Sequence, residues 1–339
     1  MQGALFHMNK TNSTPTMKDV AAEAGVALGT VSKVVNGLPV GDSYKVRVEE
    51  AIKKLNYQVN SYAQGLKLQK TRTIALLIPN TKEPFYGALA YYINISLLKR
   101  KYRMLLCSTD SDMGQEQEYI KMAQNNKVDG IIGLTYNPDL VIEEGTPFVA
   151  IDRSMGSRIP CVASDNFAGG QLAAEKFADL GCRKVAFLRT GASLNNEPNK
   201  RRAGFENGCL SRNLAYEMKI LNDGDPYQEF DEFLVSHMKN GKLEFDGLFC
   251  VTDGIAYYIM KVLRGLNLKI PEDVQVIGFD GVKNVGGDYV CSTIVQPVSE
   301  IAEMCVELLL QENMPVKPPL VCLPVTYAYG GTTAEHMKE

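Results

Sequence analysis

The 339-residue sequence has no tryptophan, only three histidines and no pair of cysteines at CxxC spacing. The missing tryptophan removes the best stacking platform, so a flat ligand would have to pack on Phe or Tyr. No histidine lies near a cysteine at the spacing of metal ligands, so we assign no metal and no cofactor. Five of the eight dispersed cysteines lie in apolar patterns and are expected to be small buried hydrophobes in a reducing compartment. These five are Cys107, Cys161, Cys250, Cys305 and Cys322.

Long apolar runs are also missing. No run of 18 apolar residues occurs, so no segment is expected to span a membrane. Residues 1–15 lack a basic start and a sustained apolar stretch, and are typical neither of a signal peptide nor of an anchor. We expect a disordered leader there, with Met8 or Met17 as alternative starts. The length and the 45% apolar content predict two or three domains with a sizeable core.

Sequence motifs of common enzymes are absent as well. The chain holds no GxGxxG after a strand, no GxxxxGK[ST], no GxSxG and no HExxH. Carboxylates in a cleft could in principle form a glycosidase pair, but nothing in the sequence requires one. We therefore assign no catalytic residue and expect no enzyme.

The most informative segment that is present is TMKDVAAEAGVALGTVSKVVN, residues 16–36. Thr16 can cap a first helix, and Asp19 three residues later completes a capping box. Gly25 suits a tight turn because a left-handed backbone costs glycine little. A second helix is expected over 28–36. This is the helix-turn-helix layout, whose second helix can lie in the DNA major groove.

Two short helices around a glycine also occur in many proteins that do not bind DNA, so the surroundings of the motif matter. A third helix is expected over 44–56 and would bury Val48, Ile52 and Leu55. Residues 1–72 hold 10 Lys and Arg against 5 Asp and Glu, whereas the remainder holds 26 against 34. A basic module on an acidic body is the charge pattern expected of contact with phosphates.

The remainder of the chain alternates between short apolar runs and amphipathic stretches. Such alternation predicts parallel sheets, and two sets of it predict two similar lobes with a ligand cleft beyond the carboxyl ends of the strands. The expected strands are 73–79, 103–108, 130–134, 147–152, 184–188, 216–221, 247–251 and 274–279. The expected helices lie near 86–100, 115–126, 167–180, 199–212, 227–240 and 254–265.

Aromatic, acidic and guanidinium side chains gather in the loops after these strands and in the adjoining helix 199–212. They could pack on a ring and form bidentate hydrogen bonds with a polar small molecule. The alternative for each acid is a helix cap or a salt bridge between the lobes. A sugar or sugar derivative is the favoured ligand, and a purine or another metabolite remains open. The candidate residues are Phe85, Tyr86, Asp152, Arg153, Arg201, Asp253, Asp280 and Gln296.

At this point the chain resembles the lactose-repressor (LacI/GalR) family of bacterial transcription factors, from about Thr16 to Thr333. The strings that carry the resemblance are DVAAEAGV (19–26), TVSKVVNG (30–37), LNYQVNSYAQGLK (55–67), VDGII (128–132), AIDR (150–153), SDNFAGGQLAAEKFADLG (164–181), RRAGF (201–205) and IPEDVQVIGFDG (270–281). The resemblance implies a small all-α helix-turn-helix DNA-binding domain followed by an α/β two-lobed, periplasmic-binding-protein-like domain with parallel sheets.

The resemblance also implies the division of the chain. The expected parts are a leader 1–15, a helix-turn-helix domain 16–58, a hinge 59–72 and an effector-binding and dimerisation domain 73–335, with one lobe of 73–163 plus 293–320 and another of 164–290 plus 323–335. Among the ligand candidates, it matches Phe85, Asp152, Arg201, Asp280 and Gln296 to effector positions. Glu83 and Thr252 each stand where the family commonly has Asn.

The hinge is too short to be a stable free helix, and Gly65 weakens it further. In the resembled family this segment folds on the operator and inserts a leucine between base pairs in the minor groove, at a cost of unstacking. Leu66 stands at that position, with Ala63 on the same face. The alternative is a plain flexible linker.

By the same resemblance, the bases are read by Leu28, Gly29 and Lys33. The sequence departs from the family here, because Leu28 offers only apolar contact, Gly29 offers no side chain and Ala27 replaces a common Ser or Thr cap. Contacts to phosphates position the protein without specifying sequence. Their candidates are Thr16, Thr30, Ser32, Asn36, Lys45 and Arg47.

The function implied is that of a homodimeric repressor in the bacterial cytoplasm, associated with the nucleoid and bound to a pseudo-palindromic operator in double-stranded DNA under the control of an effector. Whether the effector induces or co-represses stays open. The alternative is a sugar-binding protein without a DNA-binding role. The basic N-terminal module argues against it. The C-terminal sequence lacks apolar heptads, so a coiled-coil tetramer is not expected.

Overall fold

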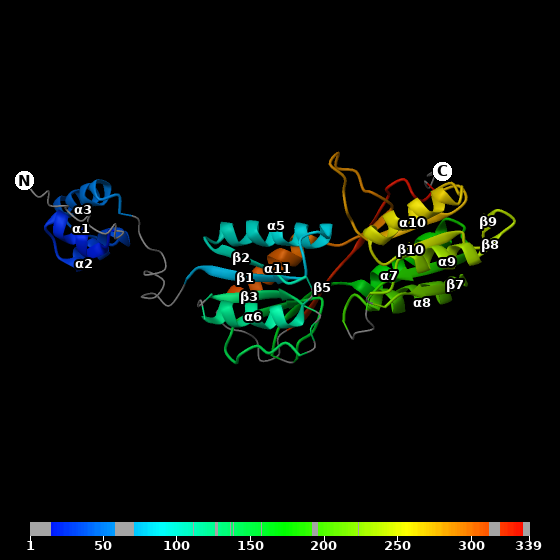
Figure 1. Ribbon diagram of the computed structural model, residues 1–339, viewed down its shortest axis with the longest axis horizontal. Coiled ribbons are helices and arrows are strands. Elements are labelled where there is room, and N and C mark those ends of the chain that lie inside the picture. Colours follow the sequence, from blue (N-terminus) through cyan, green and yellow to red (C-terminus); the bar gives the residue numbers. More distant parts are fainter. Residues whose placement is uncertain are drawn as a thin grey trace, which may run out of the picture. The chain divides into compact units, whose positions relative to one another are not determined.

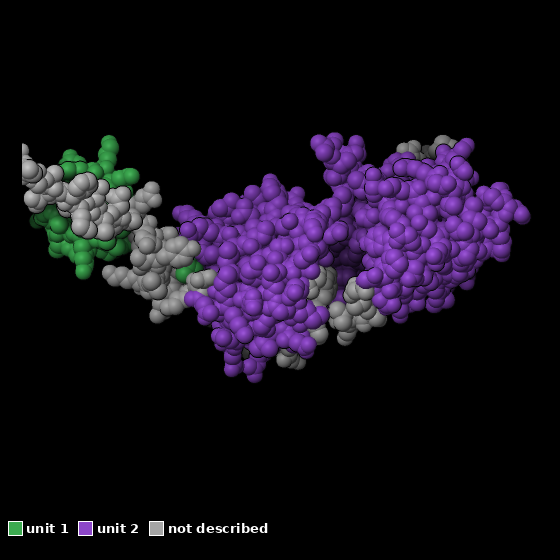
Figure 2. All heavy atoms as spheres, viewed as in Figure 1, with its two compact units in different colours: residues 1–71 green, residues 72–339 purple. Residues whose placement is uncertain are grey.

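A computed structural model gives the structure of the chain (Figure 1). Two compact units divide between Thr71 and Arg72 and are coloured separately in Figure 2. Residues 1–14 of the expected leader and most of the hinge, with Ala63 and Leu66, lie outside the described residues. The structure describes residues 15–57, 71–110, 112–125, 128–135, 137, 139–156, 158–191, 196–222, 224–311 and 319–334. Within these ranges, no helix is both long enough and apolar enough to cross a membrane.

The first unit is a bundle of three helices around one small core. Its helices are α1 (Met17–Ala24), α2 (Leu28–Val35) and α3 (Asp42–Lys54). Val20, Val31 and Val48 come one from each helix and are fully buried against one another, with Tyr57 closing the cluster. The third helix begins two residues earlier than expected and ends at Lys54, while Ile52 and Leu55 pack on the core only partly buried.

The first sheet of the second unit is wholly parallel, in the order β13-β5-β4-β3-β1-β2. Alternate residues of β1, the strand next to the edge strand β2, face opposite ways, as a pleated strand requires. Ile74 and Leu76 pack with α5 (Pro84–Lys99) and α11 (Val298–Leu310), whereas Leu77 packs with α6 (Met113–Asn125). Figure 1 shows α5 and α6 on opposite sides of this sheet. The strands are β1 (Thr73–Ile78), β2 (Arg103–Ser108), β3 (Gly130–Leu134), β4 (Phe148–Ile151), β5 (Cys161–Ser164) and β13 (Leu320–Leu323).

The second sheet repeats the plan in the order β14-β12-β11-β10-β6-β7, with only β14 antiparallel among the strands described. Its strands are β6 (Lys184–Arg189), β7 (Ala215–Ile220), β10 (Gly247–Cys250), β11 (Gln275–Asp280), β12 (Thr293–Val295) and β14 (Thr326–Ala328). Its helices are α7 (Asn166–Asp179), α8 (Lys200–Ser211), α9 (Gln228–Ser236) and α10 (Asp253–Gly265). The expected fold class, a helix-turn-helix unit and a two-lobed α/β unit with parallel sheets, is confirmed.

The structure corrects three details of the expected layout. Residues 293–295 form β12 of the second sheet rather than part of the first lobe, because β12 pairs with β11, so the chain crosses between lobes only after β12. The helix expected over 227–240 ends at Ser236 and gives way to a hairpin of β8 (Met238–Lys239) and β9 (Lys242–Leu243). Cys322, expected to be buried, is exposed because it lies on the edge strand β13.

Candidate functional site

The start of α1 and the turn after it have the predicted geometry. The Thr16 backbone N–H donates to Asp19 Oδ2 at 2.7 Å, and the Asp19 N–H donates back to Thr16 Oγ1 at 3.4 Å. Asp19 Oδ2 accepts hydrogen bonds from the Thr16 N–H and from Thr16 Oγ1, both at 2.7 Å, and these bonds favour the charged carboxylate and lower the pKa of Asp19. Gly25 has a φ of 61°, the left-handed conformation that the turn requires. The capping box and the glycine turn are therefore confirmed.

Arg47 holds that turn from α3. Its Nη2 donates to the Gly25 carbonyl oxygen at 2.9 Å, and a Cβ on Gly25 would lie 2.6 Å from the same nitrogen. Any side chain at Gly25 would therefore displace the guanidinium as well as strain the backbone. Arg47 has an architectural partner in this unit, and its contact with a phosphate stays a prediction.

The outward side of α2 carries the three predicted base readers. Leu28 is 46% exposed, and Gly29 and Lys33 are exposed as well. A Cβ on Gly29 would meet no atom of the described residues within 4 Å, so the surface at this position is flat and open. At the start of this helix, Ala27 offers no side-chain hydrogen bond to the described backbone. The helix is thus presented to solvent, but its first turn is less well held than that of α1.

The six predicted phosphate contacts differ in exposure. Asn36 Nδ2 donates to the Ser32 carbonyl oxygen at 2.6 Å and to Ser32 Oγ at 3.3 Å, which closes the end of α2. The exposed members are Thr16, Asn36, Lys45 and Arg47, and the half-buried ones are Thr30 and Ser32. All six belong to the first unit.

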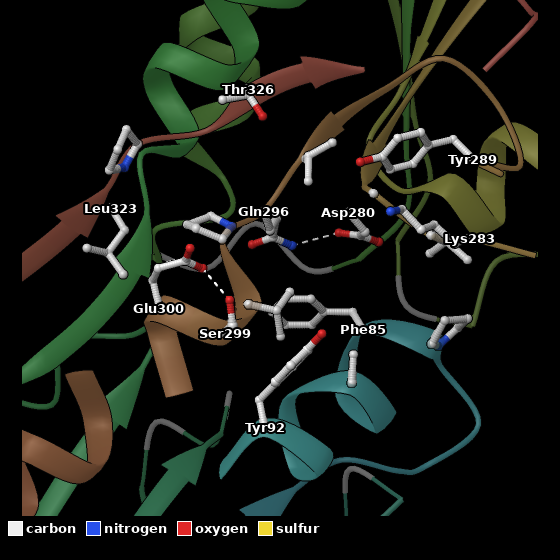
Figure 3. Close-up of a pocket in the computed structure, with 18 residues that line it drawn as sticks. Phe85, Tyr92, Asp280, Lys283, Tyr289, Gln296, Ser299, Glu300, Leu323 and Thr326 are labelled. Atoms are coloured by element: carbon white, nitrogen blue, oxygen red, sulfur yellow. Dashed lines mark hydrogen bonds between the residues drawn. The ribbon is translucent and has the colours of Figure 1, made fainter. Parts of the chain in front are cut away.

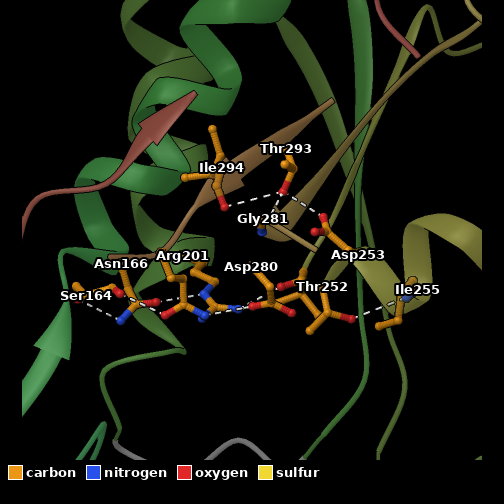
Figure 4. Close-up of polar contacts among 12 residues, drawn as sticks. Ser164, Asn166, Arg201, Thr252, Asp253, Ile255, Asp280, Gly281, Thr293 and Ile294 are labelled. Carbon is orange, nitrogen blue, oxygen red and sulfur yellow. Dashed lines mark hydrogen bonds and ion pairs between the residues drawn. The ribbon is translucent and has the colours of Figure 1, made fainter. Parts of the chain in front are cut away.

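In the second unit, Arg201 lies at the centre of a buried polar cluster (Figure 4). Its Nε donates to Asn166 Oδ1 and its Nη1 to the Val251 carbonyl oxygen, both at 2.7 Å. The guanidinium carbon lies 3.6 Å from the centre of the Phe279 ring, and Nη1 lies 3.9 Å from Asp280 Oδ1. Hydrogen bonds on one edge and the ring on one face orient the remaining donors toward Asp280.

Asp280 and Gln296 connect the two sheets (Figure 3). Gln296 Nε2 donates to Asp280 Oδ1 at 2.7 Å, while its Oε1 accepts a hydrogen bond from Ser164 Oγ of β5 at 2.8 Å. Burial raises the pKa of Asp280 to about 8, even though Arg201 favours its charged form. Asp280 also has a φ of 123°, a strained conformation of the kind that gathers at binding sites.

Asp152 directly follows the carboxyl end of β4 in the first sheet and is 2% exposed. Its backbone has a φ of 60°, and its Oδ1 has no hydrogen-bond partner among the described residues. Burial raises the pKa of Asp152 to about 6, while Arg201 lowers it and Glu197 raises it. A buried acceptor without a donor costs folding free energy, so it is a natural place for a ligand to donate a hydrogen bond.

A cavity of about 670 Å³ lies between the two sheets and is lined by Phe85, Asp280 and Gln296 from the predicted set (Figure 3). The described lining residues do not include Asp152 or Arg201, but Arg201 is ion-paired with the lining residue Asp280. The prediction missed Tyr92, Lys283 and Tyr289. Its own rule on strand ends pointed to the loop that holds Lys283, but nothing in the sequence marked Tyr92.

The structure places three predicted ligand residues in other settings. Asp253 is 1% exposed, and its carboxylate accepts hydrogen bonds from Thr293 Oγ1 and the Val282 N–H, both at 2.7 Å. It holds the loop after β11 instead of facing the cavity. Arg153 is bound to the Asn137 carbonyl oxygen. Tyr86 packs edge-on against the Phe85 ring, with 5.8 Å between ring centres.

A three-helix unit with an open second helix, followed by a two-sheet unit with a polar cavity, defines a ligand-controlled DNA-binding protein. The chain belongs to the LacI family. The family described as "Bacterial regulatory proteins, lacI family" matches residues 16–60, and the periplasmic binding protein-like domain matches residues 174–333. The chain is 33% identical to the sucrose operon repressor of Pediococcus pentosaceus over 88% of its own length and 92% of the relative. It is 32% identical to the ribose operon repressor of Halalkalibacterium halodurans over 88% and 90%.

Solved structures agree with this assignment. The periplasmic binding protein/LacI transcriptional regulator from Alkaliphilus metalliredigens, complexed with D-xylulofuranose, is 26% identical, with a TM-score of 0.68 over 78% of this chain and 100% of that one. The lac repressor dimer bound to operator shares the fold, with a TM-score of 0.81 over 95% and 100% at 20% identity. The chain is therefore a DNA-binding transcriptional regulator of a family that is not enzymatic.

Proposed function

We propose that this protein is a homodimeric repressor whose affinity for a pseudo-palindromic operator is controlled by a sugar or sugar derivative bound in the second unit. The observation that carries the proposal is the oriented set of Arg201, Asp280 and Gln296 beside the Phe85 ring. Charged hydrogen-bonding groups next to an aromatic face suit a molecule with several hydroxyl groups. The names of the sucrose and ribose repressors among the relatives support the same class.

On the DNA side, two copies of the first unit would read the two half-sites of the operator on the nucleoid. Lys33 would reach a base edge, Leu28 would offer apolar contact, and the flanking polar groups would bind phosphates. Residues 59–72 would act as the hinge, with Leu66 as the minor-groove wedge and Ala63 beside it. The lac repressor structure that shares this fold is a dimer on its operator, which supports the same arrangement here.

Effector and operator would be coupled through the two lobes. A ligand that binds one arrangement of the lobes better than another shifts the balance between them. The operator and the effector must then change each other's affinity by the same factor. This reciprocity can be measured without knowing in advance whether the effector induces or co-represses.

The test is an in vitro selection of genomic DNA fragments by the purified full-length protein, with and without sucrose, ribose and fructose. The proposal expects enrichment of a palindromic site and a sugar that changes its affinity. The Lys33→Ala protein serves as the control for reading by α2 and should lose that preference. Sugar binding without any DNA enrichment would favour the alternative, a sugar-binding protein without a DNA-binding role.

A further inference from the structure

The polar cluster around Arg201 holds more carboxylates than cations. Arg201 Nη1 lies 3.9 Å from Asp280 Oδ1, and the charge of Arg201 lowers the pKa of both Asp280 and Asp152. Asp253 adds a third buried carboxylate whose charge acts on Asp280. The cluster thus holds three acids and one buried guanidinium, so an anion brought into it would meet repulsion without a new cationic partner.

The neighbouring cations are already engaged. Lys200 pairs with Glu197 at 2.8 Å, and Arg153 is bound to the Asn137 carbonyl oxygen. Lys283 is the one further cation among the described residues that line the cavity. It lies on an exposed loop with its Nζ 4.8 Å from the Tyr289 ring centre.

Asp152 provides an independent sign that a ligand belongs here. It is 2% exposed, and its Oδ1 has no partner among the described residues, although the charges of Arg201 and Asp280 from the other lobe interact with it. A carboxylate can only accept hydrogen bonds. The group that would satisfy it must therefore donate, as a hydroxyl or an ammonium group does.

Glu83 adds a further acid where the family commonly has Asn. It precedes α5, yet its Oε2 would lie 3.8 Å from a Cβ on Gly254, in the first turn of α10. The Thr252 hydroxyl accepts a hydrogen bond from the Ile255 N–H at 3.3 Å, so it is already used as a cap. The Glu83 carboxylate thus adds one more hydrogen-bond acceptor beside the first turn of α10.

From these contacts we propose that the effector is uncharged or cationic and donates a hydrogen bond from a hydroxyl or ammonium group to Asp152. The surplus of acids in the cluster, to which Glu83 contributes, disfavours binding of the phosphorylated form of the same molecule. This inference rests on the proposed function in assuming an effector at this site, and it narrows the chemical class of that effector.

The test compares matched ligands on the full-length protein by isothermal titration calorimetry. The pairs are D-fructose with fructose 6-phosphate, D-ribose with ribose 5-phosphate, and sucrose with sucrose 6-phosphate. We expect the uncharged member to bind at least about tenfold more tightly, which corresponds to roughly 1.4 kcal/mol. Glu83→Gln should narrow that ratio, whereas Glu118→Gln, an exposed acid on α6, should leave it unchanged. Equal or tighter binding of a phosphate would overturn the inference and assign the anion to Lys283.

A second arm needs no ligand. Asp152→Asn removes a buried charge that has no partner on Oδ1, so the melting temperature of the sugar-free protein should rise by about 2 °C or more. Its matched control is Asp253→Asn, which should lower the melting temperature because Thr293 and Val282 donate to that carboxylate. A fall for Asp152→Asn would overturn the charge argument. If Asp152→Asn is stabilised but none of these sugars binds, the charge argument stands and the sugar of the proposed function fails.

Discussion

A Cβ atom on Gly170 would lie 2.1 Å from the carbonyl oxygen of Arg201. Helices α7 and α8 therefore meet backbone to backbone, and Gly204 makes the reciprocal approach, with its Cβ position 1.9 Å from the Phe167 carbonyl oxygen. The side chain of Arg201 extends from α8 at this contact, and its Nε donates to Asn166 Oδ1 at the start of α7. The glycines thus set the position of the guanidinium as well as the spacing of the helices.

Gly204→Ala should separate the two helices and damage both stability and ligand binding. Overpacking of this kind costs about 1–3 kcal/mol in the free energy of unfolding, and movement of Arg201 should weaken effector affinity severalfold. Thermal melts and calorimetry with the identified sugar measure both effects. In Gly265→Ala the new methyl would meet nothing within 4 Å among the described residues, so this control should be neutral or slightly stabilising. A Gly204→Ala protein that matches the control would contradict the argument.

Much of the fold could be predicted from the pattern of apolar residues. The runs that became β1 and β11 are nearly all apolar because their residues are buried on both faces of a parallel sheet. Thr16, Asp19 and Gly25 carry local chemistry that determines a helix start and a turn wherever the segment lies. The short edge strands β13 and β14 were missed, because their half-exposed residues leave no continuous apolar run.

The candidate site was less predictable, because residue types do not tell which way a side chain faces. Asp253 and Asp280 both follow a strand of the second sheet, yet Asp253 turns inward to Thr293 while Asp280 meets Gln296 at the cavity. The ion-pair partner of Asp280, Arg201, comes from a distant stretch of the chain. Such pairings depend on tertiary packing, so sequence spacing identified the candidates without separating a structural acid from a binding one.

Raised pKa values in the second unit predict that its stability falls as the pH rises. Burial raises the pKa of Asp152 to about 6 and that of Asp280 to about 8, from 3.8 in the unfolded chain. Between the unfolded pKa and the folded pKa of each group, the folded state binds more protons than the unfolded state. The contribution of these two acids to the free energy of unfolding is therefore fully present below about pH 4 and is lost as the pH rises to about 8. For Asp152 the change is about 3 kcal/mol.

Thermal melts of the sugar-free protein between pH 5 and 8.5 should therefore show a falling melting temperature. The Asp280→Asn protein should have a flatter profile, since the amide does not titrate and can still accept from Gln296. A wild-type melting temperature that rises steadily over this range would contradict the assignment.

Lys33→Ala should weaken specific operator binding by about 1–3 kcal/mol if Lys33 reads a base. The loss should be smaller on non-specific DNA, since a base contact adds nothing there. Binding of matched and scrambled operators by fluorescence anisotropy at fixed salt measures this ratio. Lys53→Ala, an exposed cation near the end of α3, is the control for general charge. An unchanged sequence preference would remove Lys33 from the base readers.

Leu66→Ala tests the minor-groove wedge in the hinge, which lies outside the described residues. Removing the wedge should reduce operator affinity and DNA bending while leaving effector affinity intact. Bending can be measured by gel mobility of permuted operator fragments. Equal DNA bending by the wild-type and Leu66→Ala proteins would contradict the wedge and favour a plain flexible linker over residues 59–72.

Substitution of Arg47 distinguishes its architectural role in the turn from a contact with a DNA phosphate. Because its guanidinium donates to the Gly25 carbonyl oxygen, Arg47→Ala should destabilise the first unit by about 1 kcal/mol, the typical net contribution of one hydrogen bond. If Arg47 also binds a phosphate, the slope of log affinity against log salt should become shallower by about 1. Lys45→Ala, an exposed cation on the same helix, should change the slope alone.

Melting of the first unit, followed by near-ultraviolet absorbance of its tyrosines, measures the loss of stability. Titrations at several salt concentrations measure the change in slope. A lower melting temperature with an unchanged slope would make Arg47 a brace for the turn, and an unchanged melting temperature would show that the hydrogen bond to Gly25 contributes nothing to stability.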